Sequence, residues 1–269
     1  MNETSLTLAA RPGPLGAVRR HPVAATLIAM FAVSYTLLIP PALAGLPLEP
    51  FLLAVVLFGQ LLPAVLVTAT VGGRPAVRDL FARVFRWRFS PWWWLVALFA
   101  IPVASLLVAT VMFGPGALQA VATDRSVLLA YLGQLTILTL VNLWEETAWT
   151  GVVQARLAAH RGELRAAVIV GLLFGLLHLP LQLGKPLGTL LRDLSLLMVF
   201  SIGLRIVIGR LYAVTGGSIL IAAVTHATFN ATNNHDLLSA AAPGNEVLTV
   251  VPWVVTAVVG IVLVVLGRR

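Results

Sequence analysis

Two adjacent carboxylates, Glu145 and Glu146, lie within an apolar run that extends from Leu135 to Ala155. An ionised side chain at the centre of a membrane helix costs about 2.5 to 3.5 kcal/mol to insert, so a pair of them indicates a function. Counted from Arg156, the first charge after the pair, Glu145 lies about 16 Å along a helix, close to the middle of a bilayer. The pair is therefore a candidate for chemistry inside the membrane.

Two histidines are expected at a similar depth on two further helices. His178 lies about 20 Å along the helix axis from Arg165, and His226 lies about 15 Å from Gly216. Residues four apart share a helix face, so Asn230 is expected beside His226. We therefore expect these side chains to form one polar site with the two carboxylates.

Carboxylates and imidazoles together supply a general base and donors for a developing oxyanion. These are the groups needed to activate water against a carbonyl, so peptide-bond hydrolysis is one chemistry that fits. The same groups could carry protons or bind a divalent cation, and the spacing alone leaves these alternatives open. Because the chain has no cysteine, thiol nucleophiles and disulfides are excluded.

The elements that must position these residues are membrane helices. The 269 residues are 59% hydrophobic and only 10% charged, which excludes a water-soluble monomer. The fold class expected is all-α, a polytopic helical bundle with about eight transmembrane helices. The apolar runs that predict them are 23–43, 51–71, 92–113, 135–155, 166–181, 187–208, 217–230 and 247–266.

The net charge of +8 follows the topology. With a cytoplasmic N-terminus, only Arg125, Lys185 and Arg192 fall in outer segments, which matches the positive-inside rule for eight spans and two cytoplasmic termini. Nucleic acid is therefore not an expected partner, whereas the bilayer is. We expect residues 1–22 to be a disordered cytoplasmic tail and residues 23–269 to be a single transmembrane domain.

An amphipathic interfacial helix is expected between the second and third apolar runs. Its apolar residues recur at steps of three and four, and the positions between them are rich in arginine: Val77, Leu80, Phe81, Val84 and Phe85 alternate with Arg74, Arg78, Arg83, Arg86 and Arg88. Trp92, Trp93 and Trp94 follow Pro91 and mark re-entry at the headgroup level, so this segment is an anchor.

Three ordered motifs resemble those of the CAAX protease and bacteriocin-processing family of intramembrane endopeptidases (CPBP, also called ABI). They are the stretches Glu145–Gly151 (EETAWTG), Phe174–Pro180 (FGLLHLP), and Gly217-Ser218 leading to His226–Asn230 (HATFN). The resemblance covers about residues 135–234, which we expect to be the protease-like core.

The resemblance implies a role for each matching residue. Glu145 would be the base that activates water, assisted by His178, while His226 and Asn230 would hold the oxyanion and Glu146 would support them. Both metal-dependent and metal-free mechanisms are argued for the family. If a metal is used, zinc is the candidate and Glu145, His178 and His226 are its expected ligands.

The chain departs from the family pattern at Thr150, where the first motif has arginine. Arginine supplies a fixed charge and a donor fork, whereas threonine offers one neutral hydroxyl. Arg156 is too far along the same helix to substitute. Arg205 is a better candidate, because it lies in the apolar run 201–208 and its long side chain could extend toward the site or toward the cytoplasm.

Two classes of function follow from the resemblance. The first is an intramembrane endopeptidase that cleaves a membrane-associated protein or a bacteriocin-type peptide. The alternative, suggested by Thr150, is a catalytically impaired scaffold, immunity or regulatory protein. A bacterial inner membrane is the expected location, and the sequence leaves the oligomeric state open.

Overall fold

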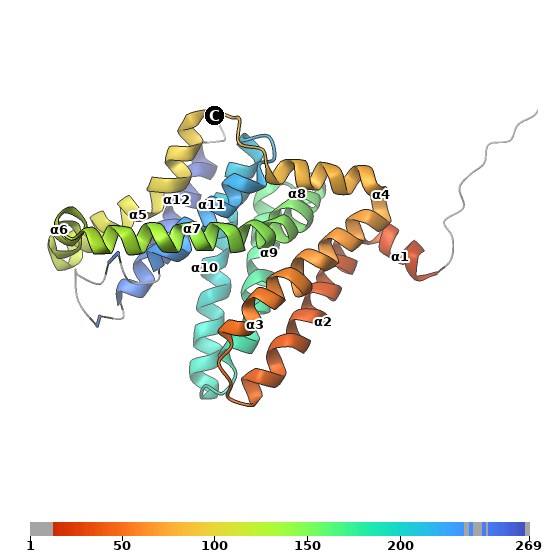
Figure 1. Cartoon of the computed structure of the whole chain (residues 1–269), viewed down its shortest axis with the longest axis horizontal. Coiled ribbons are helices and arrows are strands. Elements are labelled where there is room, and N and C mark those ends of the chain that lie inside the picture. Colours follow the sequence, from red (N-terminus) through yellow and green to blue (C-terminus); the bar gives the residue numbers. More distant parts are fainter. Residues whose placement is uncertain (1–12, 234–236, 239–243, 246, 267–269) are drawn as a thin grey trace, which may run out of the picture.

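The computed structural model describes residues 13–233, 237–238, 244–245 and 247–266, and each element within them is a helix (Figure 1). The elements are α1 (Pro14–Arg20), α2 (Pro22–Leu43), α3 (Glu49–Ala54), η1 (Val55–Leu61), α4 (Leu62–Val84), α5 (Pro91–Phe113), α6 (Gly116–Thr123), α7 (Arg125–Ala148), η2 (Trp149–Gln154), α8 (Ala155–Arg161), α9 (Glu163–Leu177), η3 (Leu179–Gln182), α10 (Leu187–Val214), α11 (Ile219–Asn233) and α12 (Val247–Leu266). Residues 1–12 of the expected tail lie outside the described residues. In the rest of that segment the structure has α1 and the start of α2.

Six helices in the described part of the chain are long and apolar enough to cross a membrane. They are Pro22–Leu43, Glu49–Val84, Pro91–Phe113, Arg125–Arg161, Leu187–Val214 and Val247–Leu266. The two other expected spans form α9 and α11, which have 15 residues each. A helix of that length rises about 22 Å, which is less than the thickness of the hydrocarbon core.

The short helix α11 is buried by its neighbours along nearly its whole length. It packs against α5, α7 and α10, and residues on every side of it are excluded from the surface. The sequence of such a helix is apolar for the same reason as that of a membrane span, because both are excluded from water. Its position in the interior brings His226 to the centre of the bundle.

A break at Gly73 divides α4 into two parts with different roles. The residue has φ +64°, a left-handed conformation that glycine adopts readily, and it interrupts the helical geometry. In Figure 1 the part after the break turns sharply away from the direction of the part before it. Leu80 and Val84 of this second part are fully buried and the arginines at 74 and 78 are exposed, which confirms the predicted amphipathic helix.

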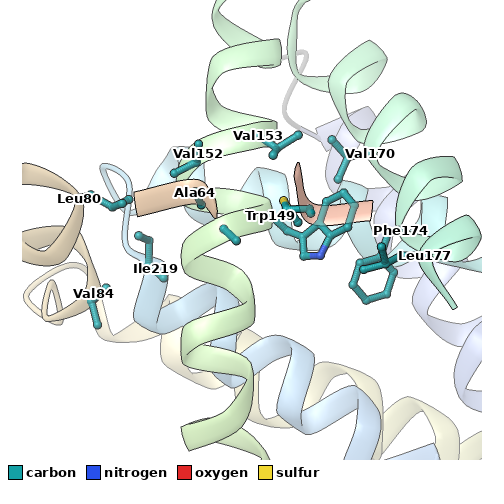
Figure 2. Close-up of a cluster of buried hydrophobic side chains, with 12 residues drawn as sticks. Ala64, Leu80, Val84, Trp149, Val152, Val153, Val170, Phe174, Leu177 and Ile219 are labelled. Carbon is teal, nitrogen blue, oxygen red and sulfur yellow. The ribbon is translucent and has the colours of Figure 1, made fainter. Parts of the chain in front are cut away.

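Trp149 is fully buried at the point where the core meets the polar site (Figure 2). Its ring packs edge-on against Phe174 at 5.4 Å between centroids, and Figure 2 shows Leu177 next to that phenylalanine. The indole Nε1 donates a hydrogen bond of 3.0 Å to Gln60 Oε1 on η1. Because tryptophan directly follows α7, this anchor fixes the helix end that carries the glutamate pair.

Candidate active site

Glu146 is the most heavily bonded carboxylate of the site. Its side chain is fully buried, and Arg205 of α10 donates from Nη1 to Oε2 at 2.8 Å and from Nη2 to Oε1 at 3.0 Å. This two-point pairing fixes both groups, because a guanidinium matches the two oxygens of a carboxylate. The Thr150 hydroxyl also donates to Glu146 Oε2. The geometry confirms that Arg205 extends into the site rather than toward the cytoplasm.

His226 joins α11 to the same carboxylate. Its Nδ1 lies 2.7 Å from Glu146 Oε1 and 3.8 Å from Glu145 Oε2. A histidine held at Nδ1 by a carboxylate has a fixed ring orientation and leaves Nε2 for a second partner. The Glu146 carboxylate therefore connects three helices, α7, α10 and α11.

Glu145 differs from its neighbour in access and in bonding. Its side chain retains 11% of its exposed area, whereas that of Glu146 retains none. No arginine or lysine among the described residues forms an ion pair with Glu145, and its closest charged contact is the His226 ring at 3.8 Å. Of the two carboxylates, only Glu145 therefore retains any exposed side-chain area.

His178 lies at the end of α9, where the helix passes into η3. Its Nδ1 lies 2.7 Å from the Phe174 carbonyl oxygen, so Nδ1 carries the proton and Nε2 is free to accept one. The residue is partly exposed and interacts electrostatically with Glu145. The free Nε2 suits a group that can take up a proton.

The ring of Phe174 holds the two imidazoles and the arginine together. Its centroid lies 4.7 Å from that of His178 and 5.6 Å from that of His226. On another side, the Arg205 guanidinium carbon lies 4.1 Å from the same ring, within the range of a cation–π contact. His178 is therefore positioned relative to His226 through an aromatic side chain.

Asn230 follows His226 by one turn of α11 and is partly exposed. Its helix packs along α7, which carries the glutamates. The structure thus brings Glu145, Glu146 and His226 into direct proximity, adds His178 through Phe174, and places Asn230 one turn further.

Some residues that fix the site were not singled out from the sequence. Gln154 of η2 donates a 2.8 Å hydrogen bond to the Arg205 carbonyl, and Gln60 accepts from Trp149. Both are buried polar residues within apolar runs, the same signal that identified the glutamates. Both also lie in π-helical segments, which often occur at functional sites but carry no simple sequence signature.

The expected zinc ligands do not form a metal site in the described part of the chain. No group of three or more His, Asp or Glu side chains is arranged there to hold one ion. The Nδ1 atoms of His178 and His226 are each within hydrogen-bond distance of another protein oxygen, the Phe174 carbonyl and Glu146 Oε1. These bonds leave the Nε2 atom of each ring without a described hydrogen bond, so the zinc ligation expected for Glu145, His178 and His226 stays a prediction.

Close contact between α9 and α10 sets the distance between His178 and Arg205. A Cβ atom on Gly171 would lie 2.6 Å from the Cα of Ile202, and one on Gly175 would lie 2.6 Å from the Cα of Met198. Both distances are shorter than real contacts, and the obstacle is backbone. Paired small residues of this kind allow two membrane helices to pack closely.

Replacing Gly175 by alanine is therefore expected to push α9 away from α10 and to displace Phe174 and His178. Overpacking of this kind costs about 1 to 3 kcal/mol, so we expect a lower thermal unfolding temperature and at least tenfold less activity. The matched control is Gly133→Ala on α7, where nothing lies within 4 Å of the added atom. Equal unfolding temperatures for the two variants would show that the close contact does not constrain the site.

The fold and the site together define a helical membrane protein with a carboxylate and imidazole centre inside its bundle. Residues 87–232 match the family described as Type II CAAX prenyl endopeptidase Rce1-like, and this is more than half of the chain. The chain belongs to this family, which confirms the resemblance found in the three motifs. No curated protein matches the sequence.

Proposed function

We propose that the protein is an intramembrane endopeptidase that hydrolyses a peptide bond of a membrane-associated substrate by means of glutamate-activated water. The observation that carries the proposal is the contrast between the two glutamates. Glu146 is fully buried and paired with Arg205, whereas Glu145 has no ion pair with a described arginine or lysine and retains 11% of its side-chain exposure. Family membership supports a protease of the CAAX type.

In the proposed reaction, Glu145 takes a proton from water while the water oxygen attacks the carbonyl carbon of the substrate. His226 and Asn230 donate to the oxyanion that forms. When the tetrahedral intermediate collapses, the carbon–nitrogen bond breaks, and Glu145 returns the proton to the leaving amine with the help of His178. The products are a carboxylic acid and an amine, so one water is consumed.

Charge balance at the centre supports this division of roles. Two carboxylates and one arginine leave one negative charge when both imidazoles are neutral. A proton held by His226 brings the group to neutrality and makes its Nε2 a donor toward an oxyanion.

We favour the protease over the catalytically impaired scaffold. Thr150 is the only observation that suggested impairment, and Arg205 supplies the charge and the donor fork that threonine lacks. We further propose that both termini face the cytoplasm, that the protein lies in a bacterial inner membrane, and that its partners are a peptide or membrane-protein substrate and the bilayer.

The proposal is tested with purified full-length protein in liposomes that contain a membrane-protein extract and, separately, a prenylated CAAX peptide. New N-termini are identified by mass spectrometry, with and without a zinc chelator. We expect wild-type protein to generate new termini that are unaffected by the chelator. Loss of cleavage in the presence of the chelator would show that the reaction needs a metal and would contradict the metal-free mechanism. No cleavage by folded protein would contradict the proposal as a whole.

A further inference from the structure

Four arginines occupy the outward side of the second part of α4 and the loop that follows it. We name the arginine face as the surface formed by Arg74, Arg78, Phe85, Arg86, Trp87 and Arg88, all of which are exposed. Two pockets of about 520 and about 530 Å³ lie along it and share Ala82 as a lining residue. The two pockets therefore adjoin at Ala82, and each of them is lined by two of the four arginines.

The positive charge of this face is not neutralised within the described part of the chain. No described carboxylate forms an ion pair with any of the four arginines. Asp79 also lines the first of these pockets, but its carboxylate is 3.2 Å from Arg83 Nε and is paired there. The face thus presents four cationic forks to an anion.

Exposed aromatic residues accompany the arginines. Phe85 retains 69% of its exposed area, Trp87 58% and Trp92 62%. The Arg88 guanidinium carbon lies 5.1 Å from the Trp87 ring, so charge and ring are presented together. Aromatic rings of this kind are favoured at the level of lipid headgroups, whereas a water-soluble ligand would leave them unburied.

The helix that carries the face is held rigidly from below. Leu80 and Val84 are buried in the core, and Arg83 donates to the Tyr212 hydroxyl at 2.6 Å. Arg86 donates to the Gly216 carbonyl, which fixes one of the four forks directly. A donor that is already held in place binds an anion with a smaller loss of entropy than a flexible one, and this applies to Arg86.

We propose that the arginine face binds the phosphate headgroup of anionic phospholipids at the membrane interface. Guanidinium groups pair with phosphate through two parallel hydrogen bonds, and the aromatic side chains bury their rings among the neighbouring lipids. A basic residue near an anionic lipid surface favours binding by about fivefold, so several of them give a marked preference over a zwitterionic lipid. This inference does not depend on the proposed protease activity.

The test compares phosphatidylglycerol with phosphatidylcholine of the same acyl chains, added to the purified full-length protein in detergent. Lipid adducts are measured by native mass spectrometry, and apparent dissociation constants are compared. We expect wild-type protein to bind phosphatidylglycerol about tenfold more tightly. The variant Arg74→Gln/Arg78→Gln/Arg88→Gln is expected to reduce this preference to about twofold or less, and Arg78→Gln alone to reduce it partly.

The control removes the same charge elsewhere, in Arg125→Gln/Arg161→Gln/Arg192→Gln, whose residues are also exposed. It is expected to keep the wild-type preference. An equal loss in the control would overturn the proposal, since net charge alone would then explain binding. Displacement of the lipid by an equal concentration of glycerol phosphate would also overturn it, because the face would then be a site for soluble phosphate.

Discussion

Replacing Arg205 by glutamine is expected to destabilise the protein by about 3 to 5 kcal/mol and to abolish cleavage. The arginine is fully buried and forms two hydrogen bonds with Glu146, so its removal leaves a carboxylate without a cationic partner in the interior. The consequence extends to His226, because the same carboxylate fixes that ring. Unfolding temperature in detergent and cleavage rate are the two measurements.

The control is Arg210→Gln on the same helix. Arg210 is 3.6 Å from Glu163 and both side chains are substantially exposed, so this pair contributes less than about 1 kcal/mol. If the unfolding temperature fell by the same amount in both variants, the positive charge on α10 rather than the buried ion pair would determine stability.

A second-site change tests the role of the charge more directly. In Arg205→Ala/Thr150→Arg, the guanidinium moves to the family position four residues after Glu146 on the same helix. The deletion at 205 provides volume for the longer side chain, since both positions are fully buried. We expect partial recovery of cleavage over Arg205→Ala alone. If the double variant is folded but cleavage does not recover, the guanidinium must come from α10 and its charge alone is not sufficient.

Arg205 illustrates how much of the site the sequence could predict. An arginine within an apolar run is costly to insert into a membrane unless it has a partner, so its position in the sequence alone showed that it was important. Its direction was not, because a long side chain can extend several ångströms to either side of its Cα. The direction depends on the contact between α7 and α10 at Glu146, which only the tertiary structure provides.

The structure does not confirm the expected count of eight spans, because six described helices are long and apolar enough to cross a membrane. Hydropathy does not distinguish a helix that faces lipid from one that is buried by other helices, and α9 and α11 are both short apolar helices. The depth of His178 and His226 was predicted from rise per residue, which is nearly constant in any helix. In the structure both rings lie close to Phe174, at centroid distances of 4.7 Å for His178 and 5.6 Å for His226, and their depth in a bilayer stays a prediction.

The metal ligands were the least predictable part. A set of Glu and His residues at one depth satisfies the chemistry of zinc binding, but ligation depends on where each ring nitrogen points. Hydrogen bonds that are invisible in the sequence fix the ring orientations, namely those from the two Nδ1 atoms to the Phe174 carbonyl and to Glu146, and they leave Nε2 as the nitrogen that could meet an ion. Side-chain direction, rather than residue type, decides the outcome.

Substitution by glutamine is expected to affect mainly activity at Glu145 and mainly stability at Glu146. Glu145→Gln removes a base without disturbing a described ion pair with arginine or lysine, so cleavage should fall by about 10²- to 10⁴-fold while stability changes by less than about 1 kcal/mol. Glu146→Gln leaves the Arg205 charge buried and unpaired, so it should lower stability by about 3 kcal/mol or more. Glutamine preserves the size of both side chains, so packing is matched between the two variants.

The measurement is a paired one, with unfolding temperature and cleavage rate determined on the same preparations. If Glu145 is the base, the first variant is folded and inactive, whereas the second loses stability first and activity as a consequence. Reversed results, with a stable Glu146→Gln protein that is inactive and an unstable Glu145→Gln protein, would transfer the role of base to Glu146. Because Glu146 has no exposed surface, that result would also require water to reach it by a movement of Arg205.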